Sequence, residues 1–124
     1  DHSLEVMGDP ESLSELLENL VSNAIKYTPA GKDVRLSLDR RGNQAELCIS
    51  DSGIGIPPGE EERIFDEFYR ATNARESGKD GTGLGLSIVK AIVETHEGEM
   101  SLESEIGKGT SFRILLPAGG RRRL

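Results

Sequence analysis

The sequence contains no tryptophan, a single cysteine and only five aromatic residues among its 124. The lone Cys48 excludes an internal disulfide and fits a reducing compartment. No apolar run approaches the roughly 20 residues that a membrane-spanning helix needs, and no signal-peptide pattern is present. We therefore expect a soluble, cytoplasmic domain whose core consists mostly of leucine, isoleucine and valine.

Basic residues are also in the minority. Fifteen lysines and arginines stand against 22 acidic residues, which gives a net charge of −7. A nucleic-acid partner needs a broad basic face, so this balance argues against one. The basic run at residues 121–123 is most simply a solvated tail. Any bound phosphate must be held by local donors rather than by the field of the whole domain.

The spacing of apolar residues predicts an α/β domain. An N-cap acceptor followed by proline, Asp9-Pro10, opens a helix that ends near Thr28. A second helix is predicted at 84–96 and a short helical piece at 60–69. Alternation predicts strands at 34–38, 45–49, 100–103 and 110–116, with a further short strand at 2–7. We expect one domain over residues 1–124, a two-layer sandwich with a mixed sheet of about five strands covered on one face by about three helices.

Two common phosphate-binding signatures are absent from the sequence. No Gly-Lys pair is followed by serine or threonine, so there is no Walker-type loop. No three glycines have the spacing of the dinucleotide fingerprint. If the domain binds a nucleotide, it does so through a different phosphate-binding motif. The clustering of most of the 15 glycines is a first hint, because glycine lets a backbone approach a ligand closely.

One cluster of polar residues lies on the first predicted helix. Glu15, Asn19, Asn23 and Lys26 share one flank beside the apolar stripe. Asparagine is a poor helix former, so its recurrence at this border calls for a reason. Amide oxygens can ligate Mg²⁺ while phosphates supply the charge, and Lys26 can reach a phosphate oxygen. The alternative is that both amides face solvent or bond to nearby backbone.

Two glycine-rich segments are candidates for ligand contacts, one directly after a predicted strand and the other leading into a predicted helix. At residues 51–57, a carboxylate at the strand end can accept a hydrogen bond from an amino group such as that of adenine. Taken alone this segment is a weak signal, because many strand-to-turn junctions look similar. Residues 81–87 run into the second helix, where free N–H groups and the helix dipole favour an anion.

The segment before the second glycine-rich loop adds an arginine and two aromatic residues. Three-residue spacing predicts that Phe65 and Phe68 pack in the core, whereas Arg70 is a candidate phosphate clamp. Residues 71–83 contain almost nothing apolar and are predicted to be a mobile loop with a function. Residues 107–112 alone indicate only a hairpin turn.

Together and in this order, the clusters closely resemble the ATP-binding catalytic domain of bacterial sensor histidine kinases, in the wider family of gyrase, Hsp90 and MutL. Residues 19–28 resemble the N box, 51–55 the G1 box, 65–70 the F box, 81–90 the G2 box and 107–112 the last glycine motif. The resemblance spans nearly the whole chain. It implies the family's Bergerat-type sandwich with a left-handed βαβ connection.

The resemblance also implies roles for individual residues. Asn23 would ligate Mg²⁺ with support from Asn19, Lys26 and Arg70 would contact phosphate, and Asp51 would bind the adenine amino group. Asn19, Lys26 and Arg70 would form the catalytic set, and residues 71–82 the ATP lid. The other expected nucleotide contacts are Tyr27, Gly53, Gly55, Ile56, Gly81, Thr82, Gly83, Leu84, Gly85, Leu86 and Thr110, the last through water.

One position distinguishes a kinase from a hydrolase in this resemblance. The family's ATPases carry a glutamate one turn before the metal-binding asparagine to activate water, and this sequence has Asn19 there. The expected function is therefore γ-phosphoryl transfer from Mg-ATP to a histidine. The alternatives are a non-catalytic nucleotide-sensing module and a serine kinase or ATPase of the same superfamily.

The acceptor histidine of the family lies on a separate helical domain. Neither His2 nor His96 stands in the acceptor's helical His-Glu context, and His96 reads as a helix-end residue. We expect a catalytic domain without its own acceptor, monomeric in isolation. Its expected partners are the helical domain of the same parent and a downstream response regulator. The parents of such domains are commonly inner-membrane receptors.

Overall fold

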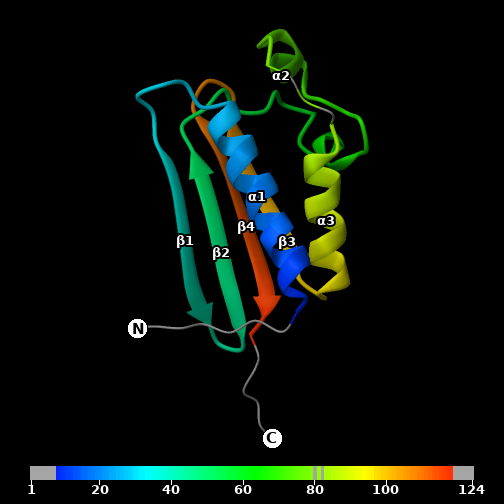
Figure 1. Ribbon diagram of the computed structural model, residues 1–124. Coiled ribbons are helices and arrows are strands. Elements are labelled where there is room, and N and C mark those ends of the chain that lie inside the picture. Colours follow the sequence, from blue (N-terminus) through cyan, green and yellow to red (C-terminus); the bar gives the residue numbers. More distant parts are fainter. Residues whose placement is uncertain (1–7, 80, 82, 119–124) are drawn as a thin grey trace, which may run out of the picture.

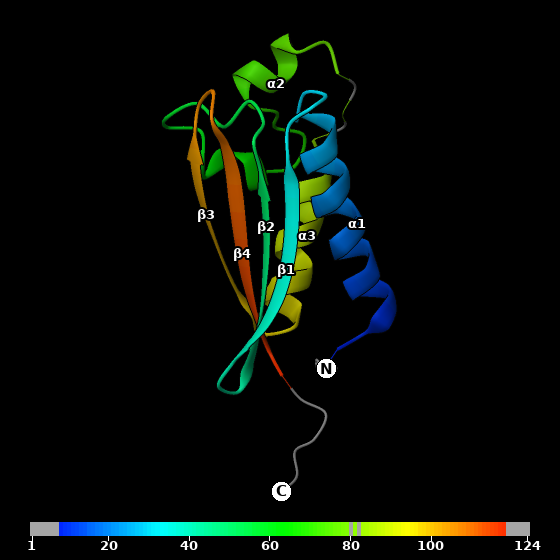
Figure 2. The same cartoon turned by 90° about the vertical axis from the view of Figure 1, so that its left-hand side faces the viewer.

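The structure is a computed structural model that describes residues 8–79, 81 and 83–118. Two helices, α1 and α3, lie side by side on one face of a sheet, and the short helix α2 lies beyond one end of it (Figures 1 and 2). The elements in chain order are α1 Pro10–Lys26, β1 Val34–Arg41, β2 Gln44–Asp51, the 3₁₀ helix η1 Arg63–Phe65, α2 Thr72–Glu76, α3 Gly85–Thr95, β3 Glu99–Glu105 and β4 Gly109–Pro117. This confirms the predicted α/β sandwich.

The described strands form a four-stranded sheet in the order β1-β2-β4-β3. All three neighbouring pairs are antiparallel, so the prediction of a mixed sheet is wrong for these strands. Tight turns force antiparallel pairing within β1–β2 and within β3–β4. The central β2–β4 pair joins distant segments and is also antiparallel, which local sequence does not determine. The strand predicted at residues 2–7 lies outside the described residues.

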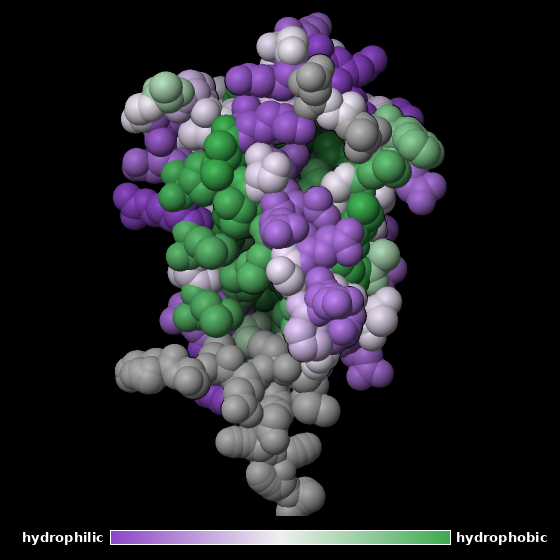
Figure 3. Space-filling view, viewed as in Figure 1, coloured by the Kyte–Doolittle hydropathy of each residue, from purple (hydrophilic) through white to green (hydrophobic). Residues whose placement is uncertain are grey.

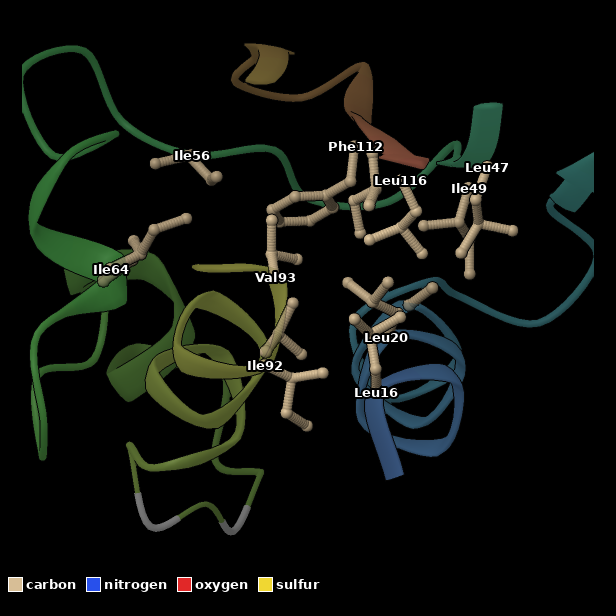
Figure 4. Packing of buried hydrophobic residues seen from close by; sticks show 14 of the residues in the cluster. Leu16, Leu20, Leu47, Ile49, Ile56, Ile64, Ile92, Val93, Phe112 and Leu116 are labelled. Atoms are coloured by element: carbon tan, nitrogen blue, oxygen red, sulfur yellow. The ribbon is translucent and has the colours of Figure 1, made fainter. Parts of the chain in front are cut away.

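The core lies between the sheet and the two long helices. Asp9 caps α1 as predicted. Its Oδ2 accepts one hydrogen bond from the N–H of Ser12 at 3.2 Å and another from the Ser12 hydroxyl at 2.7 Å. Helical spacing then turns Leu16, Leu20 and Ala24 toward the sheet. Figure 4 shows the leucines of α1 and the Ile92-Val93 pair of α3 directed at the inward side chains of β2 and β4.

A histidine joins the ends of the two long helices. His96 follows α3, as predicted for a helix-end residue, and its Nδ1 lies 2.8 Å from the carbonyl of Ile92. Its Nε2 accepts a hydrogen bond from the N–H of Asp9 at 3.1 Å. Since Nε2 is an acceptor, the proton belongs on Nδ1, where it is donated to the carbonyl. His96 therefore fixes the start of α1 to the end of α3.

The segment between β2 and α3 differs from the prediction. Only Arg63–Phe65 is helical in the stretch predicted at 60–69, and α2 lies inside the predicted loop. Polar contacts explain the difference, because Glu60 Oε1 accepts hydrogen bonds from the Tyr69 hydroxyl at 2.7 Å and the Thr72 N–H at 2.8 Å. The carboxylate thus holds the chain into α2, which apolar periodicity does not reveal.

The two aromatics of the F box have opposite environments. Phe65 packs edge-on against Phe112 with ring centroids 6.2 Å apart, which confirms its place in the core. Phe68 is 71% exposed, so its predicted core position is wrong. Its N–H bonds to the carbonyl of Gly83 at 2.8 Å and its φ is 69°. This left-handed turn breaks the three-residue helical spacing on which the prediction depended.

An apolar band remains on the surface beside the first helix. Leu36 and Leu38 of the edge strand β1 are 53% and 52% exposed, and Leu17 and Ile25 of α1 are also exposed. Figure 3 shows hydrophobic side chains gathered over β1 and the adjoining side of α1. We name these four residues the β1–α1 band.

Candidate functional site

A cleft of about 360 Å³ is lined by residues from the end of α1, the start of α3 and α2. These three parts of the chain lie toward one end of the sheet (Figure 1). This volume falls within the roughly 300–1,000 Å³ typical of small-molecule sites. The cleft brings together all but two of the predicted site residues. Those that line it are Asn19, Asn23, Lys26, Tyr27, Asp51, Gly55, Ile56, Arg70, Gly81, Gly83, Leu84, Gly85, Leu86 and Thr110. Thr82 lies outside the described residues, and Gly53 is buried and does not line the cleft.

One wall of the cleft is the last two turns of α1. Asn19, Asn23 and Lys26 all line it, as their shared flank predicted. Asn19 Nδ2 is buried and has no hydrogen-bond partner among the described residues. A buried donor left unpaired is costly, and an acceptor brought by a ligand, such as a phosphate oxygen, would offset that cost. Glu15 is exposed and does not line the cleft.

The carboxylate at the end of β2 is held by backbone. Asp51 Oδ1 accepts hydrogen bonds from the N–H of Gly53 at 2.9 Å and of Thr110 at 3.2 Å. Oδ2 has no partner in the part of the chain that the structure describes. Burial raises the pKa of Asp51 above its ordinary value, although the two hydrogen bonds act in the opposite direction. The side chain is therefore a fixed acceptor with one oxygen available to a ligand.

The first glycine-rich loop is pressed between two parts of the protein. A Cβ at Gly53 would lie 2.4 Å from the carbonyl of Tyr27, and one at Gly55, where φ is 74°, would lie 2.2 Å from the carbonyl of Glu105. The glycines thus let the loop pass between the end of α1 and the β3–β4 turn. Sequence reasoning assigned this close approach to a ligand, whereas the described contacts are with backbone.

The threonine predicted at the base of the site is part of a hydroxyl pair. Thr110 Oγ1 lies 2.8 Å from Ser104 Oγ, which also accepts a hydrogen bond from the N–H of Ile56 at 2.8 Å. Together with the Thr110 N–H on Asp51, these bonds join β3, β4 and the glycine-rich loop. They fix the floor of the cleft around the carboxylate.

The predicted phosphate clamp contacts three segments at once. Arg70 Nη2 donates to the Tyr27 hydroxyl at 3.0 Å, to the carbonyl of Lys79 at 2.6 Å and, more weakly, to that of Ala74 at 3.3 Å. In the described conformation the guanidinium therefore joins the end of α1 to the segment after α2. Lys26 Nζ lies 5.7 Å from the centre of the Tyr27 ring, which places a second cation at the same end.

The second glycine-rich segment leads into α3 across from Asn19. Gly83, with φ of 78°, crosses the backbone of Phe68 so closely that a Cβ would lie 2.6 Å from it. At Gly85 the nearest atom to such a Cβ is Asn19 Oδ1, 3.5 Å away. The start of α3 and the amide-bearing flank of α1 therefore face each other across this end of the cleft.

The sequence analysis did not assign the apolar half of the site, or the amide of Asn73, to nucleotide contacts. The apolar lining residues outside its predicted contacts are Ile54, Ile64, Ala71, Ala74, Ile88 and Phe112, some of which fall inside the predicted motifs and lid. These side chains belong to segments far apart in sequence, so no local pattern marks them as one surface. Ser22, Tyr69 and Asn73 complete the lining. Asn73 carries the clearest missed signal, a buried Oδ1 with no partner among the described residues.

No cluster of three or more histidine, cysteine, aspartate or glutamate side chains that could hold a metal lies within residues 8–79, 81 and 83–118. A Mg²⁺ ion bound with a nucleotide does not need one, because phosphates supply most of its charge and oxygen ligands. The amides on the cleft wall of α1 have the neutral oxygens such an ion accepts. The residues present therefore fit Mg²⁺ bound together with a phosphate chain.

Comparison with known protein families agrees with this geometry. Residues 8–120 match the family described as histidine kinase-, DNA gyrase B- and HSP90-like ATPase. The chain belongs to this family. Within it, the chain is an ATP-binding catalytic domain of the sensor histidine kinase type.

Individual relatives place the domain among sensor kinases. It is 45% identical over 116 residues to the sensor-like histidine kinase SenX3 of Mycobacterium tuberculosis and 43% identical over 109 residues to the sensor protein SrrB of Staphylococcus aureus. These alignments cover 94% and 88% of this chain but only 28% and 19% of the relatives. The catalytic domain thus spans less than a third of the length of the curated relatives it matches.

Solved structures have the same fold. The mycobacterial sensor histidine kinase MprB superposes with a TM-score of 0.83 at 37% identity, covering 91% of this chain and 76% of that one. Full-length ShkA, solved in complex with AMPPNP, gives 0.78 at 28% identity over 94% of this chain and 23% of that one. No helix in the described part of the histidine kinase domain has the length and hydropathy to cross a membrane.

Proposed function

We propose that this domain binds Mg-ATP and transfers its γ-phosphoryl group to a histidine on a separate helical domain of a two-component sensor kinase. The observation that carries the proposal is the combination of groups in one cleft. The fixed carboxylate of Asp51 and an apolar lining share it with the amides of α1 and the cations Lys26 and Arg70. A flat base and a charged phosphate chain need these two environments.

At the base end, Asp51 Oδ2 would accept a hydrogen bond from the adenine amino group. Ile64, Ala71 and Phe112 line the same cleft and would pack against the flat faces of the ring. The two N–H groups on Oδ1 keep the carboxylate from rotating, so little order is lost on binding.

At the phosphate end, the residues would position and neutralise the triphosphate. Lys26 and Arg70 would contact phosphate oxygens, and Asn23 would ligate Mg²⁺ with Asn19 beside it. Binding would require Arg70 to exchange the Lys79 carbonyl for a phosphate oxygen, a stronger acceptor. The residues from Gly81 to Leu86 would add N–H groups at the start of α3. When bound, Mg²⁺ would neutralise charge on the phosphates.

The reaction itself requires little from the protein beyond position and charge. A ring nitrogen of the acceptor imidazole would attack the γ-phosphorus as the bond to the β–γ bridging oxygen breaks, and ADP would leave with that electron pair. Asn19 stands where a water-activating glutamate would be needed for hydrolysis, and an amide does not take a proton from water. This favours transfer to a protein acceptor over ATP hydrolysis.

We propose that the acceptor histidine and the binding site for the stimulus belong to other domains of a longer parent kinase, and that the response regulator is a separate protein. The relatives are more than three times as long as the matched region, which leaves ample chain for a helical acceptor domain. We propose that residues 1–124 form one domain that works on the cytoplasmic side, where ATP is available.

A transfer assay tests the proposed function. The domain is mixed with the separately produced helical domain of its parent kinase and Mg-ATP labelled at the γ-phosphate. We expect label on the helical domain that is lost in acid, since phosphohistidine is acid-labile. Asn23→Ala should abolish transfer, and Glu18→Gln, an exposed residue of α1 outside the cleft, should not. Acid-stable label, or binding of ATP without transfer, would contradict the proposal.

A further inference from the structure

Asn73 of α2 lines the cleft and is anchored to the first glycine-rich loop. Its Nδ2 donates a hydrogen bond to the carbonyl of Gly55 at 2.9 Å and lies 3.4 Å from that of Ile54. Both neighbours are acceptors, so only the NH₂ group fits on this side of the amide. The orientation of the side chain is therefore determined, and Oδ1 points away from the loop carbonyls.

That oxygen is buried and has no hydrogen-bond partner among the described residues. A buried acceptor without a donor costs roughly 1–3 kcal/mol, and native proteins rarely keep one without a reason. The side chain lines the cleft, so a donor brought by a ligand is such a reason. ATP offers few donors: the two hydrogens of the adenine amino group and the ribose hydroxyls.

The position of Asn73 selects among these donors. It bonds to the loop that begins at Asp51, and Ala71 and Ala74 on either side of it line the apolar part of the cleft. Asn73 is therefore bonded to the same loop as the carboxylate that the proposed function assigns to the base. Asp51 has one available oxygen, because Oδ1 already accepts two N–H groups, whereas an amino group carries two hydrogens.

We propose that Asn73 Oδ1 accepts the second hydrogen of the adenine amino group and so is a specificity residue of the kinase site. This inference rests on the proposed orientation of the base at Asp51. A 6-oxo purine, such as guanine or hypoxanthine, would place an oxygen against two acceptors, and the domain would reject it. Because Asn73 also holds Gly55, occupation by adenine would join α2 to the glycine-rich loop through the ligand.

The test compares two nucleotides that differ only in the amino group. Calorimetric affinities are measured for ATP and for purine riboside triphosphate, which has hydrogen at position 6. For Asn73→Ala we expect a loss of about three- to tenfold in ATP affinity, with little change for the analogue. Arg75→Ala is the matched control, because Arg75 is exposed on the same helix and does not line the cleft. It should leave both affinities unchanged.

Two results would overturn the inference. Equal losses for both nucleotides would mean that Asn73 only supports the loop, and unchanged ATP affinity would remove it from the site. If Asn73→Ala fails to fold, Asn73→Ser is measured by the same ratio, since its shorter side chain also withdraws the acceptor. Asp51→Asn separates the inference from the proposed function. If this variant binds ATP normally, the proposed orientation of the base is wrong. If it binds ATP more weakly but Asn73→Ala does not, only the inference about Asn73 is wrong.

Discussion

The two oxygens of the Asp51 carboxylate have different environments, and this asymmetry suits the role that we propose for the residue in binding adenine. Oδ1 accepts two backbone N–H groups, whereas Oδ2 is left for a ligand. The side chain is also partly buried, which disfavours its charged form. A half-buried carboxylate is costly unless a ligand compensates it, so we expect this residue to contribute to binding rather than to folding.

Asp51→Asn should weaken ATP binding by about ten- to a hundredfold, because a hydrogen bond to a charged acceptor is lost. The asparagine Oδ1 can still accept both N–H groups, so the fold should persist. Calorimetry and circular dichroism measure the two effects. Asp39→Asn, at an exposed position of β1 away from the cleft, is the control and should bind ATP normally. Equal affinities in the two variants would exclude Asp51 from the site.

The raised pKa of Asp51 also predicts a dependence of stability on pH. Burial makes the folded pKa higher than the unfolded one, so folding disfavours ionisation. The cost is absent below the unfolded pKa and fully present above the folded pKa. Asp51→Asn should therefore gain stability relative to wild type as pH rises through this range, in urea unfolding without nucleotide. A constant difference between the two proteins at every pH would contradict this assignment.

At the scale of elements, the short helix α2 depends on one carboxylate. Glu60 Oε1 accepts both the Tyr69 hydroxyl and the Thr72 N–H at the start of α2. The hydrogen bond from Tyr69 is the main reason that the pKa of Glu60 is below its ordinary value. Tyr69, Ala71 and Asn73 all line the cleft, so Glu60 supports the site without lining it.

Glu60→Ala should loosen α2 and lower ATP affinity by a few fold, because two hydrogen bonds that fix the cleft wall are lost. Amide hydrogen exchange at residues 72–76 should become faster, whereas exchange in β2 and β4 should not change. Glu61→Ala, at the next position, is the control. Unchanged exchange in α2 would show that other contacts hold the helix.

At the scale of the whole molecule, the sandwich is stabilised from one side of the sheet. Leu16 and Leu20 of α1 and Val89 of α3 have almost no exposed surface, whereas the β1–α1 band is open to solvent. Exposed apolar bands of this kind on an edge strand favour association with other surfaces. The free energy of unfolding therefore depends mainly on the buried leucines, Leu16 and Leu20, whereas association with other surfaces depends on the exposed leucines of the β1–α1 band.

Leu20→Ala should lower the free energy of unfolding by about 2–5 kcal/mol, because it opens a cavity under the sheet. Leu36→Ala is the matched control on the β1–α1 band, where the side chain is 53% exposed, and it should cost far less. Urea unfolding of both variants measures the difference. If both variants lose similar amounts of unfolding free energy, the Leu36 side chain must be packed against groups that the described residues do not include.

Much of this protein follows from local sequence. The Asp9 cap, the apolar stripes of α1 and α3, and the two hairpins depend on short-range periodicity and turn chemistry, and they were predicted near their observed bounds. The amide-bearing flank of α1 is also a local property, since residues three or four apart share one helix face.

Other features required the tertiary structure. The left-handed turn at Phe68 depends on a hydrogen bond to Gly83, and α2 depends on Glu60, twelve residues before it. The apolar lining of the cleft and the unpaired oxygen of Asn73 arise only when distant segments meet. Periodicity reports which face of an element is buried, but the partner that a side chain meets is decided by contacts across the fold.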